Sequence, residues 1–154
     1  MQNLEPITDK IRHDLEAKNM ARDMALKRAR DLTRYCALTI RAVHRAEFES
    51  AAELLATAKT TFRQMVDDLA AYPDLYHAGY TQDALKEYAE ANITYALITD
   101  RPLPDPDELG VEYAAYLNGL GEAVGELRRH VLDIIRHGQL ERGEKMLSAM
   151  DEIY

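Results

Sequence analysis

Residues 8–46 decide the fold class, and they read TDKIRHDLEAKNMARDMALKRARDLTRYCALTIRAVHRA. This stretch contains no Gly and no Pro, and its apolar residues recur at helical spacing. The repeating apolar positions are Ile11, Leu15, Met20, Met24, Leu32, Ala37, Ile40 and Val43. A single helix of this length would extend for roughly 55–60 Å, at 1.5 Å per residue. The stretch therefore predicts one very long first helix.

The next part of the chain carries signals for helix ends. Ser50 and Glu53 have the spacing of a capping box, which predicts a second helix from residue 50 to the Tyr72–Pro73 step. A short helical turn is expected at residues 73–78. Thr81 is the expected N-cap of the helix that follows.

Segment 101–107 contains three prolines and is expected to be an extended connector. A helix is expected from about residue 108 to 137, ending at Gly138, and a last helix from Leu140 onwards. The sequence contains no run of alternating Val, Ile and Thr residues that would predict a β-strand. We therefore predict an all-α fold, an antiparallel helical bundle in which residues 1–154 form a single domain.

Composition limits the classes of protein that this chain can represent. Apolar residues are 47% and charged residues 30%, which is typical of a globular domain. A single cysteine, Cys36, excludes an internal disulfide framework and fits a reducing compartment. No apolar segment has the length of a signal peptide core or of a membrane span. A cytoplasmic location without a membrane partner is expected.

Charge is distributed unevenly along the chain. Residues 18–45 hold eight basic residues against two acidic ones, so this segment is +6 and the remainder is −14 within the total of −8. Such segregation can produce a positive face on an acidic protein, a feature of nucleic-acid binders. The alternative interpretation is an ordinary solvated helix face.

Four glutamates lie in two helical stretches that are otherwise nearly uncharged: Glu87, Glu90, Glu122 and Glu126. Each pair is three or four residues apart and therefore shares one helix face. Burying carboxylates is costly unless they are paired or bound to a cation, and neither apolar stretch contains a Lys or Arg. If the two helices pack together, the four carboxylates form an oxygen-only site suited to Mg²⁺ or Mn²⁺.

Gly119, Gly121 and Gly125 flank the second pair of acids. Each glycine costs roughly 1 kcal/mol in a helix relative to alanine, so a close approach of a backbone or a substrate is expected there.

Other interpretations of these residues remain open. Glu141 and Glu144 show the same spacing on a polar helix, so each pair of acids alone is also compatible with a solvated face. A di-iron site is disfavoured because its paired Glu-x-x-His motif is missing. Cys36 is expected in the core, and the histidines are expected at the surface or at helix caps. Tyr76, Tyr80 and Tyr88 are candidates for stacking on bases.

Three short motifs, in the same order, resemble the translin superfamily, and specifically its translin-associated factor X (Trax) branch with the archaeal relatives. The motifs lie at residues 30–45, 87–91 (Glu-Tyr-Ala-Glu-Ala) and 116–129 (Tyr-Leu-Asn-Gly-Leu followed by Gly-Glu-Leu-Arg-Arg). The resemblance covers residues 20–137. It implies a translin-like subunit of a closed, roughly octameric shell, whose Trax-type subunits are Mg²⁺-dependent endoribonucleases.

The resemblance also implies roles for single residues. Glu87 and Glu90 match the paired catalytic glutamates that translin itself lacks. Glu126 matches the glutamate of the Gly-Glu-Leu motif. Glu122 stands where Trax carries Asp. Its side chain is one methylene longer, which is a departure from the family pattern of metal ligands. Family members usually continue with another helix beyond the position of Tyr154, so the chain is expected to lack a C-terminal helix.

The sequence thus predicts an endoribonuclease that cleaves single-stranded or short structured RNA, with Glu87, Glu90, Glu122 and Glu126 holding Mg²⁺ or Mn²⁺. Single-stranded DNA is a further candidate ligand. Because the long first helix needs neighbours to cover it, the chain is expected to form a homo-oligomer, up to an octamer. The alternatives are a translin-like binding oligomer without catalysis and a purely structural one. The expected contacts to nucleic acid are Arg30, Arg34 and Arg129. The resemblance implies three more, because His77 is the remnant of a basic stretch in translin that Lys59 and Arg63 replace in part.

Overall fold

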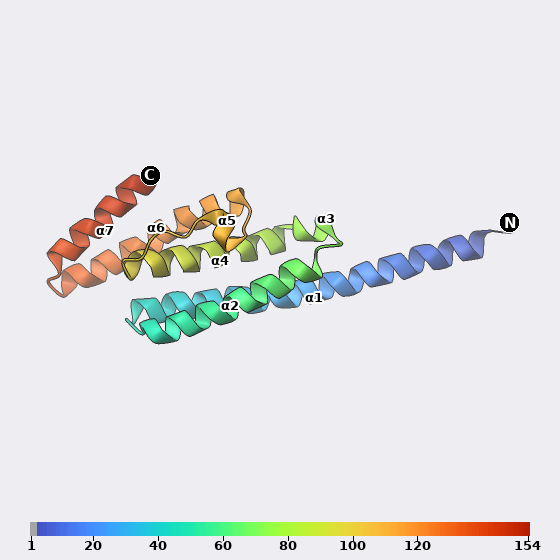
Figure 1. Cartoon of the computed structure of the whole chain (residues 1–154), viewed down its shortest axis with the longest axis horizontal. Helices are drawn as coiled ribbons and strands as arrows, with labels where there is room; N and C mark the ends of the chain where they lie inside the picture. Colours follow the sequence, from blue (N-terminus) through green and yellow to red (C-terminus); the bar gives the residue numbers. More distant parts are fainter. Residues whose placement is uncertain (1–2) are drawn as a thin grey trace.

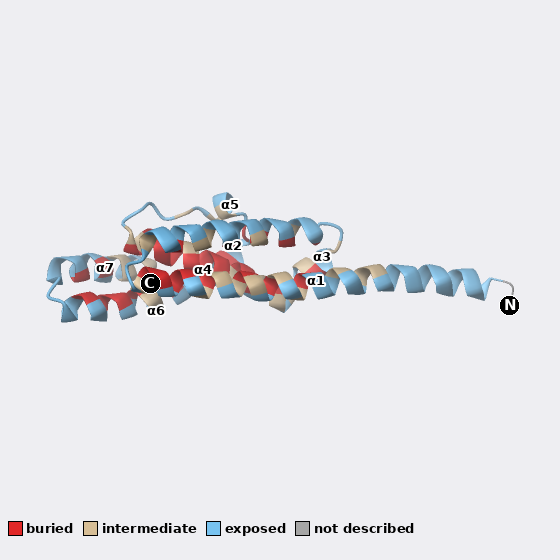
Figure 2. Cartoon of the chain, turned by 90° about the horizontal axis from the view of Figure 1, so that it is seen from below, coloured by how far each residue is buried: buried red, intermediate tan, exposed pale blue. Residues whose placement is uncertain are grey.

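The structure is a computed structural model, and it describes residues 3–154. Its first helix, α1, runs without interruption over Leu4–His44, which confirms the very long first helix. Only the C-terminal half of α1 packs into the bundle, with buried residues from Ala25 to Val43. Residues 4–16 of α1 are all exposed, and this part of the helix extends beyond the other helices (Figures 1 and 2).

Every regular element within residues 3–154 is a helix, as the all-α prediction requires. The six elements after α1 are α2 (Phe48–Asp68), α3 (Pro73–Tyr76), α4 (Gly79–Ile98), α5 (Pro106–Leu109), α6 (Tyr113–Arg136) and α7 (Leu140–Ile153).

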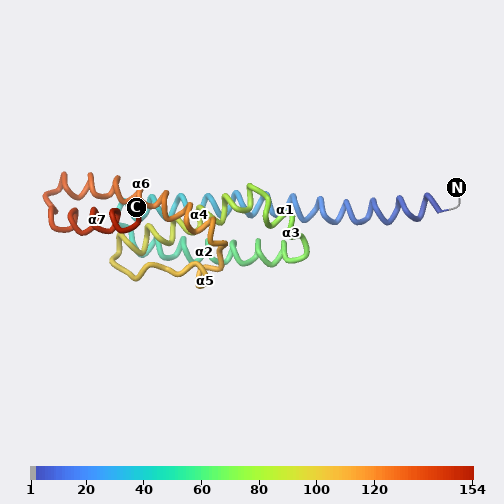
Figure 3. The backbone as a smooth tube through the Cα atoms, turned by 90° about the horizontal axis from the view of Figure 1, so that it is seen from above, coloured from blue at the N-terminus to red at the C-terminus, as the bar shows by residue number. Residues whose placement is uncertain are grey.

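The helices pack in the order α2, α1, α4, α6, α7. α1 and α2 form an antiparallel hairpin, and α7 folds back along α6 (Figure 3). The segment between α4 and α6 returns the chain to the start of α4, so α6 runs in the same direction as α4 (Figure 1). One apolar cluster joins α1, α2, α4 and α6. A second joins the turn end of the α1–α2 hairpin with the end of α4, with α6 and with α7.

Two predicted caps are wrong. α2 begins at Phe48 rather than at Ser50, because Ala46 has a φ of 59° and turns the chain so that the amide of Glu47 donates to the carbonyl of Ala42. Thr81 does not cap α4, which begins at Gly79. Its buried hydroxyl instead donates to the carbonyl of Leu75 at 2.8 Å and ties α3 to α4.

The helix expected over residues 108–137 is divided into two. Asp105 caps α5 by accepting from the amide of Asp107, and Gly110, with a φ of 75°, ends that short helix. α6 then begins at Tyr113. The breaks at residues 101–105 and at Gly138 lie where the sequence predicts them.

Across residues 3–154 we find no helix with the length and apolar character that crossing a bilayer requires.

Candidate active site

Gly119 lets α4 and α6 come close together. A Cβ atom at this position would lie 2.8 Å from the carbonyl oxygen of Lys86 and 2.9 Å from the backbone nitrogen of Glu90. The close approach predicted for this glycine is therefore confirmed. Gly121 and Gly125 differ, since a Cβ at either would meet nothing within 4 Å. Helix packing within the subunit does not explain those two glycines.

The contact at Gly119 places three of the predicted acids together. Glu87 and Glu90 of α4 and Glu122 of α6 each offer a carboxylate oxygen, and these oxygens all lie within 4.8 Å of one another. Glu90 is 7% exposed, Glu87 is half-buried and Glu122 is exposed. A cluster of this kind can hold a metal ion.

Glu90 has a strongly perturbed acidity. Its burial, followed by the negative charges of Glu87, Glu122 and Glu126, raises its pKa to about 8 from the ordinary value of 4.5. The cause is that an ionised carboxylate loses water here and meets like charges. A cation at this position would remove both penalties.

Lys86, which the sequence prediction left out, lies directly against the cluster. Its Nζ donates to Glu122 Oε1 at 2.8 Å and lies 3.3 Å from Glu87 Oε1. The hydrogen bond to Glu122 is the main reason that the pKa of Lys86 is raised. Lys86 lies just before the apolar stretch, so the sequence prediction did not include it as a partner, and it contacts two of the four predicted glutamates.

Glu126 lies at the edge of the site and has a different partner. Its Oε2 lies 2.5 Å from Nε2 of His44, at the end of α1, and 4.0 Å from Nη1 of Arg129. The charge of Glu126 still contributes to the raised pKa of Glu90. α1, α4 and α6 thus all supply side chains to one polar region between them.

The donor set fits a hard divalent cation. All three clustered donors are carboxylate oxygens. Mg²⁺ and Mn²⁺ prefer oxygen ligands, whereas softer transition metals favour sulfur and nitrogen ligands. Lys86 already supplies one positive charge at two of the carboxylates, which shows that the cluster favours a cation. A bound metal ion would compete with this ammonium group.

Two expectations for histidines are wrong. The side chain of His44 is 7% exposed, and His130 is buried with Nε2 unpartnered within residues 3–154. The two rings lie 6.2 Å apart. Their positions depend on the contact between α1 and α6, which helical spacing alone does not reveal.

Cys36 and Tyr88 are both buried in the core. The position of Cys36 is as expected, and burial raises the pKa of its thiol, with Glu87 and Glu90 adding to the effect. Tyr88 stacks on Phe62 in the core, with ring centroids 4.7 Å apart. Its predicted role in stacking on bases is therefore wrong.

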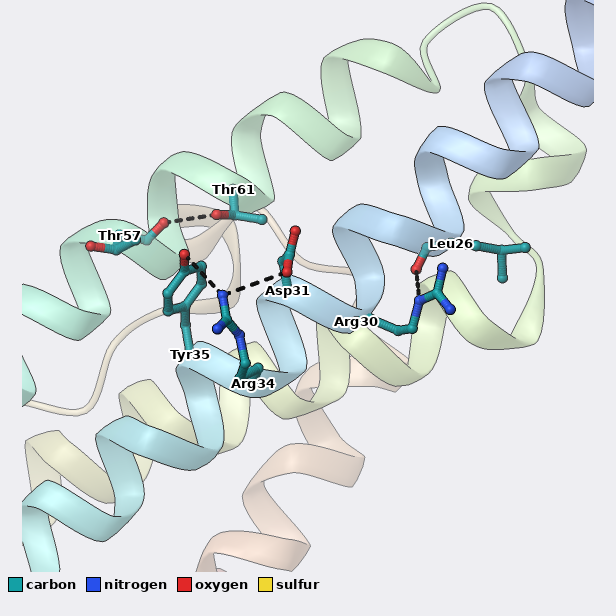
Figure 4. A network of polar contacts seen from close by, with 7 residues as sticks. All are labelled: Leu26, Arg30, Asp31, Arg34, Tyr35, Thr57 and Thr61. Carbon is teal, nitrogen blue, oxygen red and sulfur yellow. Dashed lines mark hydrogen bonds and ion pairs between the residues drawn. The ribbon is translucent and has the colours of Figure 1, made fainter.

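The predicted contacts to nucleic acid lie on α1, α2 and α6 and just after α3. Arg30 donates to the carbonyl of Leu26, whereas Arg34 turns towards Asp31 and Tyr35 (Figure 4). Lys59 and Arg63 are exposed on α2, and His77 is exposed after α3. Arg129 alone of the six has an ion pair with one of the four predicted site glutamates.

The sequence prediction missed two arginines near the acids. Arg41 and Arg45 flank His44 and line a cleft of about 490 Å³ together with Arg129. The signal that could have found them is the basic segment 18–45, which contains both.

Comparisons with known proteins identify the fold. The structure of AfC3PO superposes with a TM-score of 0.88 and 32% identity, covering 96% of this chain and 76% of that one. For a complex of AfC3PO with duplex RNA the TM-score is 0.81 and the identity 31%, over 96% of this chain and 75% of that one. For apo-NeC3PO the TM-score is 0.90 and the identity 23%, over 97% of this chain and 79% of that one, so this likeness shows the fold.

A curated relative is an uncharacterized protein of Methanocaldococcus jannaschii, 28% identical over 141 residues, or 91% of this chain. The chain spans 63% of the length of that relative. No family model matches the chain. Its likeness to AfC3PO in sequence and in structure shows that the chain belongs to the translin superfamily, as an archaeal-type member related to the C3PO proteins.

Proposed function

We propose that the chain is a subunit of a Mg²⁺-dependent endoribonuclease that cleaves single-stranded or short structured RNA. The observation that carries the proposal is the group of three carboxylates within 4.8 Å, one of them buried with a pKa raised to about 8. Perturbed carboxylates of this kind are typical of functional sites. The solved complex of AfC3PO with duplex RNA supports RNA as the substrate class.

Glu87, Glu90 and Glu122 would hold Mg²⁺, or Mn²⁺ in its place. When bound, the ion would neutralise charge on the phosphate and make a water molecule more acidic. Glu90 would then be ionised, because the neighbouring cation offsets its burial. Cleavage would form a bond from a water oxygen to phosphorus and break a phosphorus–ribose oxygen bond.

The pair of His44 and Glu126 has a separate role in this proposal. The imidazole holds the carboxylate at 2.5 Å and fixes its direction beside the cluster. Glu126 would accept the proton of the attacking water, and solvent would return a proton to the leaving oxygen. His44 acts through Glu126 and is therefore a positioning residue.

The second candidate is a translin-like oligomer that binds RNA without cleaving it. Lys86 favours this alternative, since its ammonium group contacts two of the three carboxylates and could satisfy them without a metal. The two candidates differ in whether a divalent cation displaces Lys86.

Assembly is part of the proposal. The N-terminal half of α1 exposes Leu4, Ile7, Ile11 and Leu15 on one face, each more than half exposed. A helix standing alone with such a face needs a partner to cover it. We expect a homo-oligomer, up to an octameric shell, and the single buried cysteine fits a cytoplasmic location.

The test is incubation of the wild-type protein with labelled single-stranded RNA in Mg²⁺ and in EDTA. We expect cleavage in Mg²⁺ only, and at least a hundredfold slower cleavage by Glu90→Gln, as expected for loss of a group acting in the transition state. The matched control is Glu144→Gln, on the exposed face of α7, which should cleave normally. Equal rates for wild type and Glu90→Gln would exclude the proposal, and binding without cleavage would favour the alternative.

A further inference from the structure

Two basic clefts lie beside Glu126, and of the residues that line them the proposed chemistry uses only His44. The first is lined by Arg41, His44, Arg45, Arg129 and Asp133 and has a volume of about 490 Å³. The second, of about 390 Å³, is lined by Gly125, Arg128, Arg129, Leu132, Asp133 and Arg136. Because they share Arg129 and Asp133, the two clefts form one groove, which begins between the end of α1 and α6 and continues along the C-terminal half of α6.

The groove is strongly positive although the protein is acidic. Its lining contains five arginines and a single carboxylate, that of Asp133, while the whole chain has a net charge of −8. Asp133 lies 4.0 Å from Arg136 and can neutralise only one of the five arginines that line the groove. The side chains of Arg41, Arg45 and Arg128 form no ion pair within residues 3–154. These guanidinium groups are free to bind an anion.

The groove reaches the site at Glu126, which lies at the edge of the acid cluster. His44 lines the first cleft and also contacts Glu126 at 2.5 Å. Arg129, in both clefts, lies 4.0 Å from the same carboxylate. A polyanion that enters the groove at Arg41 therefore comes within one side chain of the proposed catalytic acids.

We propose that Arg41, Arg45 and Arg129 form a subsite for an RNA backbone phosphate next to the one that is cleaved, and that Arg128 and Arg136 extend the track along α6. The inference rests on the proposed function for its substrate. An acidic cluster repels RNA phosphates, so productive binding requires a cation-rich surface beside it. Arginine suits this role because its planar guanidinium binds phosphate through two parallel hydrogen bonds.

Gly125 fits the same arrangement. It lines the second cleft, and a Cβ there would meet nothing within 4 Å, so the glycine leaves the floor of the groove open. Packing of α6 within the subunit does not require this residue, whereas the approach of a phosphate backbone benefits from it.

The subsite shares only Arg129 with the contacts that the sequence predicts. Arg30 and Arg34 lie further along α1 and are engaged by Leu26, Asp31 and Tyr35 (Figure 4). Arg41 and Arg45 are four residues apart and share one face of the helix. The inference therefore assigns the main phosphate contacts to the C-terminal end of α1.

The test compares RNA binding by Arg41→Ala/Arg45→Ala and by the charge-matched control Arg22→Ala/Lys27→Ala, two exposed residues on the same helix. The probe is a short fluorescent oligouridylate, and EDTA prevents cleavage. We expect the first variant to bind roughly tenfold or more weakly and to lower the salt slope by about 0.7 per lost phosphate contact. The control should keep both values near wild type.

A probe with one neutral methylphosphonate linkage identifies the group that is recognised. Placed at the phosphate in the subsite, the neutral linkage should weaken binding to wild type but not to Arg41→Ala/Arg45→Ala. Arg41→Lys/Arg45→Lys keeps the charge and should restore only part of the affinity, since lysine lacks the paired donors.

Several outcomes separate this inference from the proposed function. If the variant binds like wild type while wild type cleaves RNA, the subsite is wrong and the nuclease stands. If binding depends on the arginines but no RNA is cleaved, the subsite stands and the nuclease falls. If light scattering shows that the variant has lost its assembly while the neutral linkage has no effect on wild type, the groove binds a protein surface and the inference is overturned.

Discussion

Nζ of Lys86 lies 2.8 Å from Oε1 of Glu122, so a side chain from the middle of α4 bridges to α6 where the carboxylates converge. The ammonium group supplies the positive charge that the cluster requires when no metal ion is bound. Removing this charge should therefore change how strongly the cluster binds a divalent cation.

Lys86→Met should bind Mg²⁺ roughly tenfold more tightly than wild type, because the ion no longer competes with a positive charge a few ångströms away. Without Mg²⁺ the variant should unfold at a lower temperature at pH 8. Titration calorimetry and thermal unfolding in EDTA check these two expectations. Weaker Mg²⁺ binding by Lys86→Met would show that the lysine supports the metal site instead of competing for it.

The pKa of Glu90 predicts how stability depends on pH in EDTA. Because its pKa is about 8 in the folded protein and near 4.5 when unfolded, the folded state binds the extra proton between these values. The free energy of unfolding should therefore fall as pH rises from about 5 to 8. Mg²⁺ should reverse part of the loss at pH 8, since it favours the ionised carboxylate.

Urea unfolding at several pH values measures this contribution. Glu90→Gln should flatten the profile between pH 5 and 8, whereas Glu144→Gln on α7 should leave it as in wild type. A Glu90→Gln profile that falls as steeply as that of wild type would show that other groups cause the pH dependence.

Gly119→Ala should destabilise the protein by roughly 1–2 kcal/mol, because the added Cβ would lie within 3 Å of the α4 backbone and overpacking outweighs the better helix propensity. Gly121→Ala is the control, with open space at its Cβ, and should stabilise by up to about 1 kcal/mol. Denaturant unfolding measures both. Equal stabilisation by the two substitutions would mean that α4 and α6 are not in the close contact described here.

The exposed half of α1 predicts self-association. Ile7→Ser/Ile11→Ser should reduce the mass measured by multi-angle light scattering, because each change removes apolar surface from the face that a partner would cover. His13→Ser/Glu16→Ser, away from that face, should not change the mass. A wild-type protein that is monomeric at micromolar concentration would contradict the expected homo-oligomer.

Helical spacing predicts the parts of the molecule that depend on neighbours in sequence. The length of α1, the connector at residues 101–105 and the pairing of Glu87 with Glu90 all follow from such local signals. The predicted cap at Ser50 is wrong because the turn at Ala46 starts α2 earlier. The predicted cap at Thr81 is wrong because its hydroxyl donates to α3 instead of to its own helix.

The composition of the site depends on tertiary contacts and is therefore less predictable. Glu122 joins Glu87 and Glu90, but Glu126 turns to His44, which lies 82 residues away in the chain. The same contact between α1 and α6 brings Arg41 and Arg45 beside the acids. No pattern within a single helix indicates which of its faces a distant helix will meet.

The central claim, that Glu87, Glu90 and Glu122 hold one divalent cation, is tested most directly by diffraction from crystals soaked in Mn²⁺. We expect an anomalous peak about 2.1 Å from carboxylate oxygens of these residues, with Nζ of Lys86 moved away. Crystals of Glu90→Gln should lack the peak or show it much weaker. An empty cluster in wild-type crystals, with Lys86 still bonded to Glu122 at saturating Mn²⁺, would contradict the claim.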